Sequence, residues 1–187
     1  MRPVLIGAPA TEPVSLTEMK AWLREDGSEE DQLIQALVVS ARMTLEAYTR
    51  RFFVTQSWRV MLDTWPRGSL LRLPFSPFQA VSAIRVYDPG GFAQTLSPDS
   101  YLAPPASDGG CLVFTSAPPP PCRIADGIEI DFSVGYGASP NETPEPLRRA
   151  IMVLATHWRE NRGDDGDDAL PKSVLQLASP FRRTRLA

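Results

Sequence analysis

Residues 28–52 form the longest uninterrupted helical pattern in the chain, and every other element has to pack around it. Ser28 offers a capping hydroxyl, and the acidic side chains that follow it suit the positive end of a helix. Because no Gly or Pro interrupts the pattern, it predicts a helix roughly 35 Å long. Apolar residues recur every three or four positions: Leu33, Leu37, Ala41, Leu45, Tyr48 and Phe52, with Ile34 and Val38 widening the stripe.

Two shorter helical patterns lie on either side of this stretch. Residues 15–18 (SLTE) are a capping box, in which the serine hydroxyl and the glutamate carboxylate each satisfy a backbone amide. They predict a short helix that ends at Asp26-Gly27. Thr143 as cap, with prolines in the first turn, predicts a third helix that stops at Gly163. Its apolar face is Leu147, Ile151, Leu154 and Trp158.

Between the second and third helices the hydrophobic period changes to two, as in half-buried strands. Strands are expected at 58–62, 71–73, 81–87, 92–96, 112–114 and 128–136. The predicted fold class is therefore α+β, a small helical core with an inserted antiparallel β subdomain and extended terminal arms. The expected segments are an N-terminal arm (1–14), a helical hairpin (15–54), the β subdomain (55–140), the third core helix (141–163), and an acidic loop with a C-terminal arm (164–187). Both arms are expected to be weakly packed.

Composition narrows the function classes. A net charge of −3 and a pI of about 5.2 argue against a protein whose main task is to neutralise nucleic-acid phosphates. Cys111 and Cys122 are interpreted as two free thiols, with a hairpin disulfide as the alternative. No apolar run approaches the ~20 residues of a membrane span, and the N-terminus lacks a signal-peptide pattern. A soluble protein that stays where it is made is expected.

The sequence contains few residues that could form a catalytic site. His157 is the single histidine, and His157 with Glu160 lacks the further ligands of a metal or acid–base site. The acidic run 164–168 lacks the spacing and the closing Glu of a calcium loop. No Gly-rich phosphate loop or nucleophile elbow is present. We expect no catalytic residue, no metal site and no cofactor.

Arginines and terminal aromatic residues favour binding instead. Arginines lie at the end of the second predicted helix and along the third, and we predict that they contact neighbouring subunits. They are Arg50, Arg51, Arg148, Arg149, Arg159 and Arg162. The tail combines apolar and basic side chains, as in a segment that docks on a partner. Its candidate contacts are Phe181, Arg182, Arg183, Arg185 and Leu186.

Six segments occur in a characteristic order: 13–23 (PVSLTEMKAWL), 31–48 with its LIxAL beginning and LEAY close, 73–77 (LPxxP), 134–137 (VGYG), 146–151 (PLRRAI) and 157–162 (HWxENR). In these segments and their order the chain resembles the head–tail connector (adaptor) proteins of tailed bacteriophages and gene transfer agents, the family called gp6-like or phiE125 gp8-like. The resemblance covers nearly the whole chain. Where members often have Tyr in the last of these segments, this chain has Trp158-Arg159, and its β insertion is longer than in the shortest relatives.

The resemblance implies a non-enzymatic ring of twelve copies that sits below the portal protein and links the capsid to the tail. It implies contacts with the portal, with copies of itself and with a stopper or other tail-side neck protein, and a channel through which DNA passes without sequence-specific binding. No membrane contact is implied. The tail residues named above would then grip the portal. The helices would form the ring wall, and the β subdomain would project outward or tailward. The implied location is the bacterial cytoplasm during assembly, then the neck of a virion or gene transfer agent particle.

Other functions stay open at this stage. The chain could be another ring of the same neck, a stopper or a tail terminator, distinguished by the neighbour it binds. A small DNA-binding module would use the arginines on phosphates, against the acidic pI. A small hydrolase would depend on His157 as its base.

Overall fold

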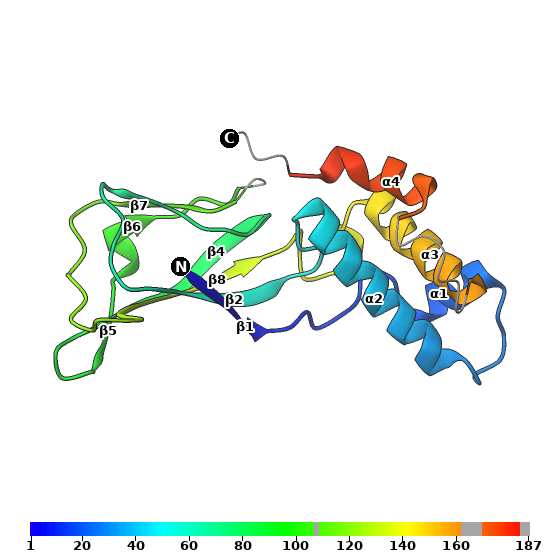
Figure 1. The fold of residues 1–187 in the computed structure, drawn as a ribbon, viewed down its shortest axis with the longest axis horizontal. Coiled ribbons are helices and arrows are strands. Elements are labelled where there is room, and N and C mark those ends of the chain that lie inside the picture. Colours follow the sequence, from blue (N-terminus) through cyan, green and yellow to red (C-terminus); the bar gives the residue numbers. More distant parts are fainter. Residues whose placement is uncertain (107–108, 162–169, 184–187) are drawn as a thin grey trace. The chain divides into compact units, whose positions relative to one another are not determined.

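The α+β class is confirmed by the computed structural model, which describes residues 1–106, 109–161 and 170–183 (Figure 1). The chain divides into two compact units. The β unit comprises Met1–Pro9 and Thr55–Gly135, and the helical unit comprises Ala10–Val54 and Tyr136–Ala187. Each is described by itself below.

Helix α1 (Leu16–Leu23) begins as the sequence predicts. The Ser15 hydroxyl accepts from the backbone N–H of Glu18 at 3.2 Å, and the Glu18 carboxylate accepts from the Ser15 N–H at 2.9 Å, so the capping box is complete. The helix ends earlier than expected, because Arg24 turns the backbone into the left-handed region at φ 57°.

Helix α2 (Asp31–Thr49) is shorter than the expected 28–52 helix. Its N-cap is Glu30, which makes no side-chain capping bond, so the prediction that Ser28 caps the helix is wrong. The helix stops where Arg50 adopts φ 58°. Its buried face is also rotated from the expected one: Ile34 is 1% exposed and its neighbour Leu33 is 36% exposed. Because apolar residues occupy both the Leu33 side and the Ile34 side of the helix, the sequence allowed either side to be buried, and packing against the rest of the unit selects between them.

Helix α3 (Glu145–Glu160) packs against α2 and against α4 (Lys172–Ala178), with Pro in its first turn as expected. Thr143 does not cap it and instead donates through its hydroxyl to the Phe53 carbonyl at 3.2 Å. The core of this unit collects residues from the segment before α1 and from all four helices that the described part of the unit contains: Val14, Met19, Val38, Ala41, Leu45, Leu147, Ile151, Leu154 and Val174.

The C-terminal segment differs from the expected weakly packed arm as far as Arg183. Val174 and Ala178 of α4 are fully buried, and a 3₁₀ turn follows at Ser179–Phe181. The segment is too short for a strong helical pattern, and small residues such as Ala178 give a weak periodic signal. Its helical state depends on the core that receives it.

The β unit contains two antiparallel sheets where one was expected. The first has the order β1 (Arg2–Gly7), β2 (Gln56–Leu62), β8 (Ile128–Val134), β4 (Phe78–Tyr87) and β5 (Ala93–Thr95). The second is β3 (Leu70–Arg72), β7 (Cys111–Phe114) and β6 (Tyr101–Leu102). Pro98–Ser100 and, in the helical unit, Pro140–Glu142 are 3₁₀ turns.

Strand β1 lies in a segment that we expected to be an unordered arm. It pairs along its length with β2, from Arg2 opposite Met61 to Gly7 opposite Ser57. Five of its six residues are exposed, so it lacks the alternation of buried and exposed side chains that marks a half-buried strand. A pairing that stabilises mainly through backbone hydrogen bonds leaves no hydrophobic pattern in the sequence.

The two faces of β8 have different chemistry. Ile128, Ile130 and Phe132 are fully buried on one face, as the alternation predicts. Glu129 and Asp131 on the other face are also nearly buried, beneath arginines from β2 and β4. Cys111 and Cys122 are both free thiols. Among the described residues, no helix is both long and apolar enough to span a membrane.

Candidate assembly interface

Arg148 is held inside the helical unit. Its Nε donates to the Pro13 carbonyl at 2.9 Å, Nη1 pairs with Glu145 at 2.8 Å, and Nη2 pairs with the Glu18 carboxylate of the capping box. Its side chain is only 13% exposed. Hydrogen bonds from the Ser15 backbone and side chain, with help from Arg148, lower the pKa of Glu18. This arginine joins α3 to the start of α1.

Arg159 has a similar role at the other end of α3. Its Nη2 lies 2.7 Å from Glu25 and 2.6 Å from Glu30, so it ties α3 to the connection between α1 and α2. Hydrogen bonds from Glu25 and Glu30 raise its pKa. Arg149 is exposed and lies over the Trp22 ring at 5.9 Å, so it is the better placed of the α3 arginines for a contact outside the chain.

The C-terminal candidates gather at the end of α2. Arg51 Nε donates to the Phe181 carbonyl at 2.7 Å, and the Arg183 N–H donates to the Thr49 carbonyl at 2.9 Å. The Arg182 guanidinium lies over the Tyr48 ring at 5.2 Å. We call residues 180–183 the C-terminal strap. The strap therefore lies against the end of α2, where the C-cap residue Arg50 is also exposed. Arg162, Arg185 and Leu186 lie outside the described residues, as does the acidic run 164–168.

The outward face of α2 is a candidate contact that was not predicted from the sequence. Leu33 and Met43 are 36% and 59% exposed, and the small side chains between and after them are exposed as well. From Leu33 to Ala47, the exposed apolar and small residues are three or four positions apart, which is the spacing of a helix that packs along another helix. We call this set the α2 outer seam: Leu33, Ala36, Ser40, Met43 and Ala47.

The α2 outer seam carries no ionised side chain. Asp31 pairs with Lys20 at 2.6 Å, and Arg42 pairs with Glu46 at 2.8 Å on the buried side, so the charges of α2 are all directed into its own unit. The exposed face of α3, by contrast, carries Arg149 and Glu160. A solvent-facing helix surface normally carries charge. The absence of charge from five consecutive seam positions was visible in the sequence, but only the buried face shows which positions point outward.

Nothing in the described residues points to catalysis. His157 is exposed on α3, with Asn161 Nδ2 lying 3.1 Å from its Nδ1. Within the described ranges, no three His, Cys, Asp or Glu side chains gather as a metal site requires. The candidate sites are surfaces that could contact another protein, and they are the α2 outer seam, Arg149 and the C-terminal strap.

Comparisons with known proteins give the class of this fold. No protein-family model matches the chain, and no curated protein matches it. Solved structures match it over 100% of its length and 98% of theirs. One belongs to the virion of a native gene transfer agent (GTA) particle, with a TM-score of 0.85 and 25% identity. The fold is therefore one found in GTA particles.

Two further matches specify the part of the particle. A chain from the neck of a native GTA particle, with C12 symmetry, matches with a TM-score of 0.82 and 25% identity. A chain from the neck of an empty GTA particle, with C6 symmetry, shares the fold with a TM-score of 0.86 and 24% identity. The structural neighbours of this chain are thus neck components, and the gp6-like family assignment stays a prediction.

Proposed function

We propose that this chain is a structural, non-enzymatic protein of the neck of a GTA-like or tailed-phage particle. The observation that carries the proposal is the match of the whole fold to neck components, with 98% of each matched chain covered. A match of that extent includes both units, so the architecture, and not one common motif, is shared.

Within the neck, the proposed role is that of the head–tail adaptor. Copies of the chain form a ring under the portal, join a tail-side neck protein and leave a channel for DNA. The C6 and C12 symmetries of the neighbouring necks support a ring. A ring needs two different contact surfaces on each subunit. The uncharged α2 outer seam and exposed Arg149 are proposed as such surfaces.

The C-terminal strap is proposed as the portal contact. Its backbone is anchored to the end of α2 by the bonds of Phe181 and Arg183, while the side chain of Arg182 is exposed. Arg50 and Arg51 lie beside the strap, so they belong to this contact as well as to the ring contacts proposed from the sequence.

The test is the mass of the purified chain, alone and mixed with its portal ring, by native mass spectrometry. We expect a species that joins the portal as a closed ring. Binding to a tail component but not to the portal would assign it to a stopper or tail-terminator position. A chain that joins neither would contradict the neck proposal.

Two variants locate the contacts in the same experiment. Arg182→Glu should weaken joining to the portal, while Lys172→Glu, an exposed basic position on α4, serves as the matched control. Met43→Glu places a charge in the α2 outer seam and should prevent ring closure, because the charge would be desolvated against the neighbour. Rings of normal mass and yield from Met43→Glu would exclude the seam.

A further inference from the structure

A turn of the β unit presents an aromatic side chain to solvent. Phe92 is 76% exposed at the tip of the β4–β5 hairpin. The turn is well fixed: Asp88 donates through its N–H to the Phe92 carbonyl at 3.0 Å, and its carboxylate accepts from the Phe92 N–H at 2.9 Å. Gly91 has φ +83°, a conformation that favours glycine. The backbone that carries this side chain is therefore ordered before any partner arrives.

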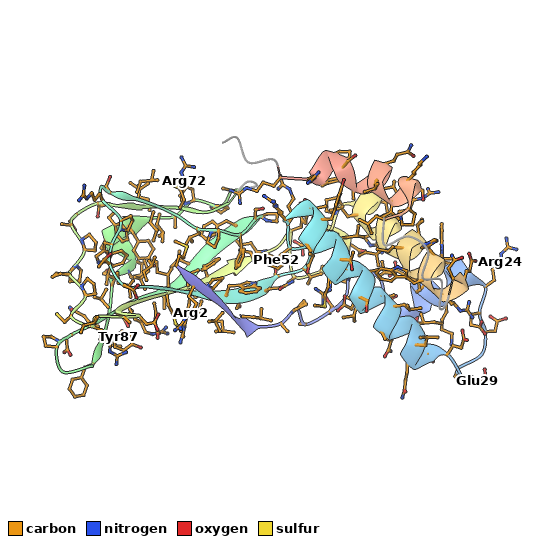
Figure 2. The ribbon with its side chains drawn as sticks, in the orientation of Figure 1. Arg2, Arg24, Glu29, Phe52, Arg72 and Tyr87 are labelled. Carbon is orange, nitrogen blue, oxygen red and sulfur yellow. The ribbon has the colours of Figure 1, made fainter. Side chains whose placement is uncertain are left out.

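A second loop holds this turn in place. The Arg123 guanidinium lies over the Tyr87 ring, 3.7 Å from its centroid, and donates to the Gly91 carbonyl at 3.2 Å. Figure 2 labels Tyr87 at the base of this hairpin. A preformed segment loses little conformational entropy on binding, which favours a contact made by few residues. We call Phe92 on this turn the knob.

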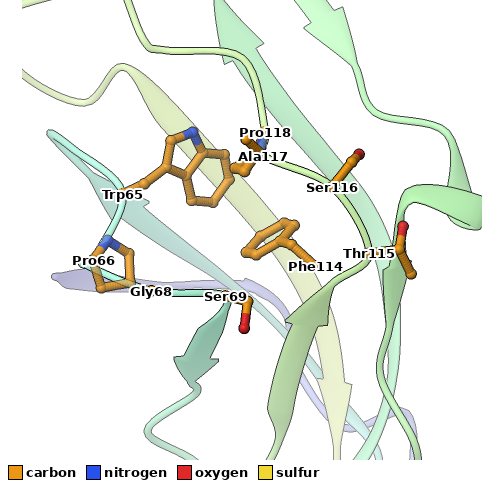
Figure 3. Close-up of a pocket in the computed structure, with 9 residues that line it drawn as sticks. All are labelled: Trp65, Pro66, Gly68, Ser69, Phe114, Thr115, Ser116, Ala117 and Pro118. Carbon is orange, nitrogen blue, oxygen red and sulfur yellow. The ribbon is translucent and has the colours of Figure 1, made fainter.

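The same unit contains an apolar pocket. Trp65 and Phe114 pack edge to face with centroids 4.9 Å apart, and Pro66 and Pro118 extend the apolar wall around a cavity of about 440 Å³ (Figure 3). Trp65 Nε1 donates to the Pro119 carbonyl at 2.8 Å, so the indole is held in one orientation. No ionisable side chain lines the pocket. Its chemistry suits an aromatic guest.

The knob does not fill the pocket of its own chain, since most of its surface is exposed. Figure 1 draws β5, which follows the knob, low in the β unit, and β7, which ends at Phe114 and is the middle strand of the second sheet, high in it. A knob in one part of the unit and a receptive pocket in another are the two halves of a head-to-tail contact between identical subunits. Such a contact either closes into a ring or continues as a filament.

We propose that the Phe92 knob of one copy inserts into the Trp65–Phe114 pocket of the next copy. The inference rests on the proposed function, because it requires that the chain assembles with copies of itself. It adds a contact between β units to the helical surfaces named above. The pocket is large enough for a phenyl ring, and ring stacking adds to the gain from burying apolar surface.

Disulfide trapping tests the contact. Ala93→Cys and Ser69→Cys are made as separate chains, both with Cys111→Ser and Cys122→Ser, and mixed with portal before mild oxidation. Ala93 is exposed beside the knob, so the Phe92 side chain is kept. Ser69 lines the pocket and is exposed. We expect a disulfide between the two chains. The matched control replaces Ala93→Cys by Gln176→Cys, an exposed position in the helical unit, and should give none. One chain with both Ala93→Cys and Ser69→Cys should give a ladder of oligomers.

The outcomes separate the two proposals. Rings of normal mass in which the trap fails overturn the knob contact and leave the neck function standing. A chain that never assembles overturns both. A second test needs no cysteines and compares the protein concentration required for assembly. Phe92→Ser should raise that concentration about tenfold or more, and Phe92→Leu should raise it much less, because leucine still buries an apolar side chain in the pocket. Equal assembly by both variants would also overturn the contact.

Discussion

Each unit buries a carboxylate under arginine, but the two sites are built differently. In the helical unit, Glu46 is 7% exposed and accepts from Arg42 at 2.8 Å and from the Phe53 N–H at 2.8 Å. Arg42 is itself buried and also pairs with Glu12 at 2.7 Å. This cluster ties the segment before α1, helix α2 and the chain after α2 into one structure.

In the β unit, the buried carboxylate lies on a sheet face under partly exposed cations. Asp131 is 6% exposed, and it accepts from Arg59 at 2.6 and 2.9 Å and from Arg85 at 2.7 Å. The two arginine side chains are 27% and 31% exposed. Losing the acid therefore leaves a buried cation in the helical unit, but in the β unit it leaves cations that water can reach.

The largest effect is expected at Glu46. Glu46→Ala leaves a buried guanidinium and a buried backbone amide without this acceptor, so the free energy of unfolding should fall by about 3–5 kcal/mol. Urea unfolding followed by circular dichroism measures it. Glu145→Ala removes an exposed pair with Arg148 and should cost about 0.5 kcal/mol or less. Similar losses for both variants would show that the Glu46 cluster is not structural.

A smaller loss, with a distinct pH dependence, is expected at Asp131. Burial would raise its pKa, but hydrogen bonds and charge from Arg59 and Arg85 outweigh burial and lower it. The resulting stability is present above the usual aspartate pKa of about 3.9 and is lost as pH falls through the lower folded value. Asp131→Asn should cost about 2 kcal/mol at pH 7, and this difference should shrink below about pH 4. A difference independent of pH would contradict the assignment.

The smallest effect is expected at Glu18, which is a capping residue at the surface. Glu18→Gln keeps a hydrogen-bonding group toward Ser15 but loses its charge toward Arg148, so the cost should be about 0.5–1 kcal/mol. Chemical denaturation at pH 7 checks it. Glu29→Gln, an exposed acid before α2, should be neutral by comparison. If Glu18→Gln lowered the free energy of unfolding as much as Glu46→Ala, the size of the loss would not follow the burial of the carboxylate.

Local chemistry made much of the fold predictable. The capping box before α1, the proline in the first turn of α3 and the alternation in β8 each act within a few residues, and each appears where the sequence places it. Strand β1 was not predictable, because its exposed side chains have no period. Helix α4 was missed because its buried residues contact a core assembled from distant segments.

The residues of the candidate interface also divide into those that the sequence indicated and those that only the structure shows. The arginines were visible as residue types, but Arg148 and Arg159 turn out to pair with acids more than 120 residues away in the sequence. The α2 outer seam and the Phe92 knob needed the structure, since exposure decides whether an apolar residue belongs to a core or to an interface.

The sequence by itself determined the capping box that begins α1, the helical character of α2 and α3, and that the middle of the chain is β structure. These are short-range effects of backbone hydrogen bonding and hydrophobic period. Only the tertiary structure decided that Ile34 and not Leu33 faces the core, that residues 2–7 join a sheet, and that the chain up to Arg183 packs on its own helices. Those choices depend on burial summed over segments far apart in the chain, which no local window contains.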